Sequence, residues 1–389
     1  MDITVDSPSF IEAVNWVTKS VDVKDNKDVL LLVDTDGKAI LSYNSVAYYK
    51  RSNFVITGLN DDVDSDILLN ISPTYLKRLA NALHNSKANS ITIKTGDNGA
   101  LNVKSELGVF TLPVSKSRLS DNIKYSSVGS VDGNEYFDYI NRIAKLCDVA
   151  NAGAIPFIGS VTLTLPADDR IQLFATDRFA FSEIFLPFAL DADADEDAKT
   201  VLKNGVLFPA ARASDISSTD SDVKIVVESV DENISARVGY EFSDGKVALY
   251  SLTEAKPFSG VKEMKKKALE NVVNSVKVNT SELKSAIKIV SDMAWSENEV
   301  VFKLNVDKLV VSDVSGSNSL KVGYLSVTFD EDYEETSLKF VRDIINESFF
   351  PITTSEINIK WGSGTAIVIE PVAEDGSRLK NVFVMTAIV

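Results

Sequence analysis

The feature of this 389-residue sequence that most restricts its fold is a repeated pair of amphipathic helix patterns. Apolar residues spaced as on one buried helix face occur in three segments, at 9–20, 134–149 and 280–295. A second set alternates with the first, at 72–83, 209–218 and 337–349, and is weakest at 209–218. Each set recurs at an interval of roughly 130 residues, the size of one domain. The sequence therefore predicts one two-helix unit repeated three times.

Short strands with turn residues lie between the helical patterns. Segments 29–43, 90–105, 240–251 and 357–372 read as hairpins, the first two closed at Asp36-Gly37 and Asn98-Gly99. Strands and helices do not alternate strictly, so a parallel sheet is not expected. We predict an α+β fold, in which each unit packs two helices on one face of antiparallel sheets.

The expected domains are 1–124, 125–268 and 269–389, with boundaries in the polar stretches 115–130 and 260–272. Thr280 or Ser281 is the expected N-terminal cap of the helix that begins the third unit, with Glu282 just inside it.

Composition excludes several classes of protein. A net charge of −16 argues against a protein that grips nucleic acid with its whole surface, unless the basic residues gather on one face. The first residues, MDITVDSPSF, are acidic and polar, so we expect no secretory signal. No apolar run approaches the roughly 18 residues that a membrane span needs. A single cysteine cannot form an internal disulfide, which fits a cytoplasmic protein.

Residue types that carry catalysis are scarce. His84, the only histidine, ends a helical pattern and is expected to be exposed, and Cys147 is expected to fill a small space in the core. The sequence contains no phosphate loop and no dinucleotide fingerprint. We therefore predict a protein that is not an enzyme and that has no cofactor.

The acidic run 191–198 is the one candidate metal site. Asp191, Asp193 and Asp195 match the first three ligand positions of a helix-loop-helix calcium site, and a hydrolase using them with a metal is the weakest alternative. However, Glu196 stands where that site needs glycine, and Leu202 stands where it needs glutamate. A solvated loop between two strands is the better interpretation, and no bound metal is expected.

Four segments resemble bacterial sliding clamps, the beta subunit of DNA polymerase III. They are ATDRFAFSE (175–183), FIEAVNWVTKS (10–20), ISPTYLKRLANAL (71–83) and VFVMTAIV (382–389). Segment 10–20 looks like the first helix of actinobacterial members. The resemblance covers all three predicted domains in order. It implies a head-to-tail homodimer that forms a six-domain ring around duplex DNA and holds the polymerase there. Such a ring catalyses nothing.

The resemblance also explains the acidic composition, because a ring held by closure needs a lining that slides rather than a phosphate grip. Acids such as Asp138 and Asp343 share the polar helix faces, so the lining would be only moderately positive. The expected DNA-facing residues are Lys77, Arg78, Arg142, Lys145, Lys284, Lys288, Lys339 and Arg342.

In this family the Thr-Asp turn helps to form a hydrophobic groove between domains two and three. The groove captures short linear peptides carried by DNA polymerases, the clamp loader and repair proteins. By position, the resemblance implies a groove lined by Phe157 or Ile158, Thr176, Asp177, Arg178, Phe179, Phe181, Pro257, Phe383, Met385, Thr386 and Ala387. The alternative for Phe179 and Phe181 is that they alternate into the core, which we expect for one of the two.

This sequence departs from the family at the groove. Family members usually have arginine where this chain has Ala180, and their Met-Pro-Met-Arg-Leu is here Met-Thr-Ala-Ile-Val, 385–389. We infer a shifted peptide preference and a divergent member, which a phage-encoded origin would explain. The alternative function is a clamp-like decoy or adaptor that binds replication partners without loading on DNA.

Overall fold

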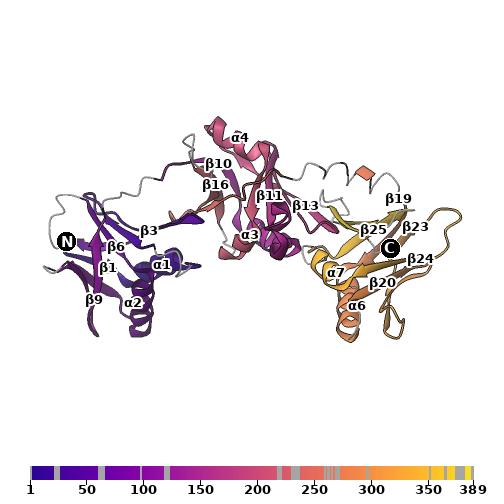
Figure 1. Cartoon of the computed structure of the whole chain (residues 1–389), viewed down its shortest axis with the longest axis horizontal. Coiled ribbons are helices and arrows are strands. Elements are labelled where there is room, and N and C mark those ends of the chain that lie inside the picture. The colour runs from indigo at the N-terminus through magenta and orange to yellow at the C-terminus, as the bar shows by residue number, and fades with distance from the viewer. Residues whose placement is uncertain are drawn as a thin grey trace. The chain divides into compact units, whose positions relative to one another are not determined.

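The computed structural model describes residues 2–386 except 22–26, 60–65, 97–98, 118–122, 217–220, 229–236, 258–259, 261–262, 264–265, 268–271, 295–297, 350–351, 363–365 and 373–381 (Figure 1). The chain divides into two compact units. Unit 1 comprises Met1–Val131, Leu190–Ala198 and Asp220–Leu252, and unit 2 comprises Asp132–Ala189, Lys199–Thr219 and Thr253–Val389. Helices combine with antiparallel sheets in both, which confirms the α+β prediction.

Unit 1 is built on a single sheet of 14 strands in the order β14-β10-β16-β17-β18-β4-β3-β2-β6-β9-β8-β7-β1-β5. The elements are β1 (Asp2–Asp6), α1 (Ser7–Thr18), β2 (Val29–Val33), β3 (Ala39–Asn44), β4 (Tyr48–Phe54), β5 (Ile56–Leu59), β6 (Ile67–Ile71), α2 (Pro73–Ser86), β7 (Ser90–Thr95), β8 (Ala100–Ser105), β9 (Gly108–Lys116), β10 (Tyr125–Asp132), β14 (Ala189–Leu190), β16 (Asp222–Glu228), β17 (Arg237–Glu241) and β18 (Val247–Ser251). Helices α1 and α2 pack against each other.

Unit 2 contains a nine-stranded sheet, β15-β11-β12-β13-β27-β26-β25-β19-β23, and a four-stranded sheet, β22-β21-β20-β24. The elements are α3 (Gly133–Ile143), η2 (Ala144–Leu146), η3 (Val149–Asn151), η4 (Pro156–Gly159), β11 (Ser160–Ala167), β12 (Arg170–Thr176), β13 (Ala180–Pro187), β15 (Val206–Pro209), η5 (Ala210–Asp215), β19 (Val272–Asn279), α6 (Thr280–Met293), β20 (Glu299–Leu304), β21 (Lys308–Ser312), β22 (Ser319–Gly323), β23 (Ser326–Thr328), β24 (Thr336–Val341), α7 (Arg342–Ser348), β25 (Glu356–Gly362), β26 (Ala366–Val372) and β27 (Val382–Thr386). Helix α4 (Glu196–Asn204) has residues in both units.

The same strand-to-helix junction occurs three times, which explains the repeated pattern. β1, β10 and β19 each run directly into a helix, and a short polar side chain caps each start. Asp6 accepts a hydrogen bond from the backbone N–H of Ser9, Asp132 from that of Glu135 and Asn279 from that of Glu282, at 2.8, 2.8 and 3.1 Å. Predicting Thr280 or Ser281 as the third cap was wrong, because Asn279 is the last extended residue.

The second set of helical patterns was only partly predicted correctly. Helix α2 matches the expected segment, but 209–218 forms only the short 3₁₀ turn η5. The prediction of a helix at 337–349 was wrong for the first part of the segment, which forms strand β24. The helix begins only at Arg342. Leu338 and Phe340 are buried and lie opposite Phe302 and Val300 of β20. Every second residue of this segment therefore faces the core, as in a strand, although the spacing of its apolar residues also fits a helix.

The two polar stretches also differ from expectation. Tyr125–Asp132, placed in a boundary, is strand β10, and 260–272 lies mostly outside the described residues. The acidic run is a loop only as far as Asp195, whose carboxylate accepts the N–H of Ala198 at 2.9 Å and caps α4. Acidic residues in a first helical turn are favourable near the helix N-terminus, so these charges start a helix. In the described chain, no helix is long and apolar enough to cross a membrane.

Two strand pairings connect segments that the sequence assigned to different domains. β18 pairs with β4, and β13 pairs with β27, so each sheet continues past an expected boundary. At the first pairing, Tyr49, Val226, Val247 and Leu249 form one buried cluster. The division at 124/125 and 268/269 stays a prediction.

The close approach of β17 to β18 gives a stability test. A Cβ atom added at Gly239 would collide with the carbonyl oxygen of Ala248 and lie 2.7 Å from Leu249 Cα. We expect Gly239→Ala to destabilise unit 1 by about 3 kcal/mol or more, because overpacking against backbone cannot relax. Gly58→Ala is the matched control, since its added Cβ would meet only Thr4 at 3.6 Å. Urea unfolding followed by circular dichroism checks this, and equal midpoints for the two variants would contradict it.

Candidate functional site

The connection between β12 and β13 is a tight turn held by side chains of its own. Thr176 Oγ1 donates to the carbonyl of Ala180 at 2.7 Å and accepts from the N–H of Arg178 at 3.0 Å. Asp177 Oδ1 accepts from the N–H groups of Phe179 and Ala180, at 2.8 and 2.7 Å. The Thr-Asp pair therefore interrupts the apolar run because its oxygens satisfy the backbone of the turn.

The turn stores backbone strain at Arg178, whose φ is 89°. A non-glycine residue in this region costs on the order of 1–3 kcal/mol and persists only where neighbouring contacts enforce it. The two hydrogen bonds to Asp177 provide that enforcement. Burial raises the pKa of Asp177, the backbone N–H groups oppose the shift, and the charge of Asp148 adds to it. Strain of this kind concentrates at functional sites.

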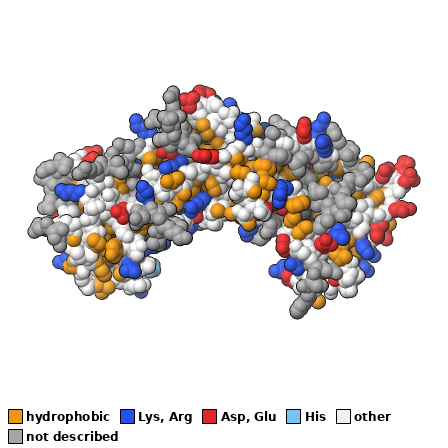
Figure 2. All heavy atoms as spheres, viewed as in Figure 1, with side chains coloured by type: hydrophobic (Ala, Val, Ile, Leu, Met, Phe, Trp, Pro, Cys, Tyr) orange, Lys and Arg blue, Asp and Glu red, His pale blue; other side chains and the backbone are white. Residues whose placement is uncertain are grey.

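The strained turn separates the two phenylalanines. Phe181 is 2% exposed and packs on Phe174, with ring centroids 5.8 Å apart, whereas Phe179 is 53% exposed. The guanidinium of Arg178 lies 5.8 Å from the centre of the Phe179 ring. One of the two enters the core, as expected, and the other offers an aromatic surface beside a cation. Figure 2 shows hydrophobic side chains gathered over the β11–β13 part of unit 2.

Strand pairing brings the C-terminal segment to this turn. β27 lies beside β13, with Met385 opposite Ala180 and Phe383 opposite Ser182. Thr386 also lies in β27, where it is opposite Ala366 of β26, and Ala387 lies outside the described residues. Segments about 200 residues apart in sequence thus form one sheet surface.

Further elements surround the turn. Helix α7 contacts β13, β27 and η2, and η4 contacts β12. η4 carries Phe157, which is half-buried, and Ile158, which is buried. Pro257 is placed elsewhere: it lies beside Gly205 and Thr164. Thr164 lies opposite Gln172 of β12. Gln172 is four residues from Thr176, a distance of roughly 13 Å along the strand at about 3.3 Å per residue.

The sequence did not predict that the loop after α3 lies beside the turn. The charge of Asp177 acts on Cys147 and that of Asp148 acts on Asp177, which places the three side chains near one another. Burial and then Asp177 raise the pKa of Cys147 to about 12, so its thiol is protonated at neutral pH. The pattern of apolar residues that predicts α3 does not indicate that Cys147 and Asp148 lie near Asp177.

The expected DNA-facing residues fall into two groups. Lys77 and Arg78 on α2, Lys145 on η2 and Lys288 on α6 are exposed. The others are half-buried and form internal contacts: Arg142 with Asp138 at 2.7 Å, Lys284 with the carbonyl of Ile352 at 2.6 Å, Lys339 with Glu299 at 3.2 Å and Arg342 with Asp343 at 3.5 Å. Placing Lys339 on a helix was wrong, because it belongs to strand β24.

Other candidate residues have simple roles. His84 is exposed in the last turn of α2, as expected. In the described part of the chain, no group of three or more His, Cys, Asp and Glu side chains could hold a metal ion. Asp191 instead accepts the hydroxyl of Ser127 at 2.5 Å, and Asp195 caps a helix.

The different positions of the two phenylalanines give a stability prediction. We expect Phe181→Ala to lower the free energy of unfolding by about 3–5 kcal/mol, because it leaves a cavity beside Phe174. Phe179→Ala should change it by no more than about 0.5 kcal/mol, since most of that ring is in solvent. Urea titration of both variants checks this, and equal losses would show that Phe179 is also a core residue.

Comparisons with known proteins identify the fold. No protein-family model and no curated protein matches the chain. Solved structures do: the Bacillus subtilis DNA polymerase sliding clamp matches with a TM-score of 0.79 at 12% identity over 100% of this chain and 99% of that chain. The Helicobacter pylori beta clamp bound to a DNA ligase peptide matches with a TM-score of 0.73 at 13% identity, over 100% of both chains. The Thermotoga maritima DNA polymerase III beta subunit matches with a TM-score of 0.73 at 14% identity, over 100% of this chain and 99% of that chain. The chain therefore has the fold of the bacterial DNA polymerase III beta sliding clamps.

Proposed function

We propose that this protein is a DNA polymerase processivity factor. It forms a ring-shaped homodimer that encircles duplex DNA without sequence preference, slides on it and catalyses nothing. Each subunit contributes clamp domains 1–124, 125–268 and 269–389, and the protein works in the cytoplasm. The observation that carries the proposal is the full-length match to beta clamps, which persists at 12–14% identity. The shifted groove residues motivate the further hypothesis of a phage-encoded, divergent member.

Two exposed apolar surfaces support a head-to-tail dimer. In unit 1, residues 108–112 of β9 pair only with β8 among the described strands, and Leu107 and Val109 beside this open edge are exposed. In unit 2, β22 is the edge of the four-stranded sheet, and α6, which packs against it, exposes Ile289 and Met293. Open strand edges recruit further strands. Because the two surfaces differ, pairing one with the other in a second copy gives a heterologous contact that can close a ring.

The charges of the helices support sliding rather than gripping. The helices α1, α2, α3, α6 and α7 carry nearly equal numbers of basic and acidic residues, whereas the whole chain has a net charge of −16. We propose that the exposed cations Lys77, Arg78 and Lys288 of these helices, together with Lys145 of η2, face the DNA. A nearly neutral surface forms few phosphate contacts, so retention depends on closure of the ring.

Retention on DNA tests the clamp function. The protein is assembled on nicked circular DNA with a bacterial clamp loader and ATP, and the complex is filtered in high salt before and after the DNA is cut. We expect retention on the circle and loss on the linear product, because a ring slides off an open end.

Two variants control that experiment. Leu107→Glu with Val109→Glu should give a single-subunit mass in light scattering and no retention, whereas Val46→Glu, at a valine that is even more exposed, should behave as the unchanged protein. A dimer that is never retained on circular DNA would contradict a clamp and favour the decoy or adaptor function.

We propose that the turn at 176–181, with η4 and β27, binds short linear peptides of the polymerase, the clamp loader and related partners. A Helicobacter pylori clamp binds a DNA ligase peptide, and this chain has the same fold. The exposed Phe179 ring beside Arg178 supplies the aromatic anchor that such interfaces use. The loss of the family's arginine at Ala180 and the exposed ring of Phe179 shift the preference towards apolar and aromatic peptide residues.

Selection from a displayed peptide library tests this site. Selected peptides should be rich in apolar and aromatic residues, and Phe179→Ala should weaken their binding at least about tenfold in fluorescence anisotropy, as expected for a hot-spot residue. Tyr75→Ala, which removes an exposed aromatic ring of α2, should leave binding unchanged. Equal binding by the Phe179 variant would place the peptide site elsewhere.

A further inference from the structure

The nine-stranded sheet of unit 2 has an open edge at β23. β23 pairs with β19 and with no other described strand, and its three residues, Ser326, Val327 and Thr328, are all exposed. Val276 of β19 is buried, yet Val327 directly opposite it is 47% exposed, because no described strand covers its outer side. Leu325, two residues earlier, is 55% exposed. An open edge with exposed apolar side chains can accept a further strand.

An acidic loop follows β23 directly. Figure 2 shows acidic side chains gathered at the end of unit 2 where Figure 1 labels β23 and β24. Within the described chain, the salt bridges of the neighbouring strands β19 and β25 are formed by other acids, Glu356 and Glu370. The loop therefore presents several carboxylates that repel one another and that a cationic partner would stabilise. The exposed acids of residues 330–335 are Asp330, Glu331, Asp332, Glu334 and Glu335.

Aromatic packing holds the acidic loop in place. The rings of Phe329 and Tyr333 stack with their centroids 4.5 Å apart, and both lie edge-on to the buried Trp361. The N–H of Asp330 donates to Asn274 Oδ1 of β19 at 3.0 Å. The loop is thus fixed before a partner arrives, which lowers the entropy that binding would cost.

The preceding repeat has an acidic run at the same place, and its carboxylates have internal roles. β14 lies beside β10 as β23 lies beside β19, and the acidic run 191–198 follows it. There, Asp191 accepts the hydroxyl of Ser127 and Asp195 caps α4. Among the described residues, the only hydrogen bond to a carboxylate of 330–335 stays within the loop, from the N–H of Glu331 to Asp330. Internal structure therefore does not account for the acids of this loop.

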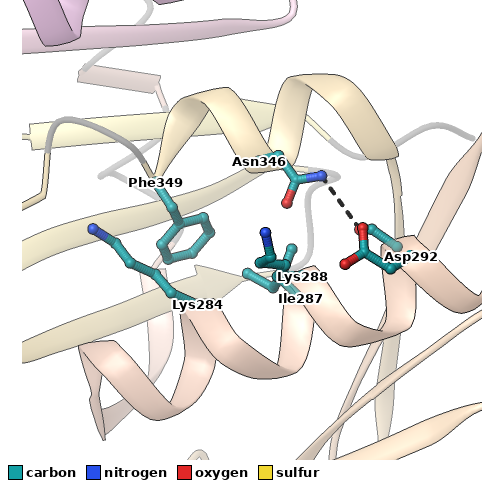
Figure 3. Close-up of a pocket in the computed structure, with 7 residues that line it drawn as sticks. Lys284, Ile287, Lys288, Asp292, Asn346 and Phe349 are labelled. Carbon is teal, nitrogen blue, oxygen red and sulfur yellow. Dashed lines mark hydrogen bonds between the residues drawn. The ribbon is translucent and has the colours of Figure 1, made fainter.

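Charge and backbone geometry together indicate the kind of partner. A phosphate would be repelled by the loop, and no described cluster of acids could hold a metal ion. A strand that carries lysine or arginine would satisfy both the carboxylates and the open edge. Elsewhere in unit 2 the charge is opposite: Lys284 and Lys288 line a cavity of about 350 Å³ between α6 and α7, together with Asn346 (Figure 3). A basic segment is therefore attracted to β23 and repelled by that cavity.

We propose that β23 and the loop 330–335 form a docking site for an extended protein segment in which basic residues precede alternating apolar residues. The segment adds a strand antiparallel to β23, like the pairings of the neighbouring strands. Because β23 runs towards the acidic loop, the N-terminal end of the added strand lies beside the loop. Its apolar residues then cover Val327 and Leu325.

This docking site is separate from both surfaces of the proposed function. β23 and β27 are four strands apart in the sheet order, which is roughly 19 Å at about 4.8 Å per strand. The proposed dimer edge β22 belongs to the four-stranded sheet. The inference therefore goes beyond the proposed function and does not require a closed ring.

A synthetic peptide of three lysines followed by three valine-threonine pairs, labelled with fluorescein, probes the site by anisotropy on the full-length protein. Glu331→Gln with Glu334→Gln should weaken binding about tenfold, because two carboxylates beside the lysines are lost. The difference should shrink as salt is raised. The peptide with its sequence reversed should also bind about tenfold more weakly. Hydrogen exchange at the backbone amides of 325–329 should slow when the probe is bound.

The matched control is Asp193→Asn with Asp197→Asn, which removes two exposed acids of the run 191–198 and should leave the affinity unchanged. Phe179→Ala should also leave it unchanged, since that ring belongs to the other peptide site. Equal weakening by the two double variants would overturn the proposal, and so would unchanged exchange at 325–329. Self-association of the Glu331 and Glu334 variant with unaltered probe affinity would overturn it as well, because the acids would then only protect an open edge.

Discussion

Backbone pairing between distant segments is the interaction on which the rest of the structure depends. β18 pairs with β4 in unit 1, and β13 pairs with β27 in unit 2, so hairpins that form locally are joined into sheets of 14 and nine strands. These bonds use N–H and C=O groups that nearly every residue carries. The only demand that such a sheet makes on the sequence is that the side chains facing the core are apolar. That tolerance is a physical reason for a beta clamp fold to persist at 12–14% identity.

The candidate peptide site follows directly from the second pairing. β27 and β12 pair with the two sides of β13, and the hydrogen bonds of Asp177 hold Arg178 at a positive φ in the turn that leads into β13. With the turn fixed in this way, Phe181 enters the core and Phe179 stays in solvent. An exposed aromatic ring on a rigid turn loses little entropy when it binds, which is what an anchor for a short peptide needs.

Charge has two separate roles in this chain. Three basic side chains of the helices form internal contacts: Arg142 and Arg342 pair with Asp138 and Asp343, and Lys284 donates to the carbonyl of Ile352. Lys77, Arg78 and Lys288 are exposed instead. The first group stabilises the fold, and under the proposed function the second group faces the DNA. Both are compatible with a strongly acidic protein, because short-range contacts depend on local charge rather than on net charge.

The sequence alone determined what depends on local period and turn chemistry: helices α1, α2 and α6, the hairpin at Gly37, and the exposed position of His84. Of the helix expected at 134–149, only the part up to Ile143 is α-helix, and 3₁₀ turns follow it. It did not determine β24, where Leu338 and Phe340 fit both a helix and a strand until pairing with β20 decided between them. The neighbours of Asp177, the open edge of β9 and the cavity that joins Lys284 to Asn346 were decided only by the tertiary structure. The physical reason is range. Periodicity reports which face of a segment is buried, whereas a site depends on which distant segment covers that face.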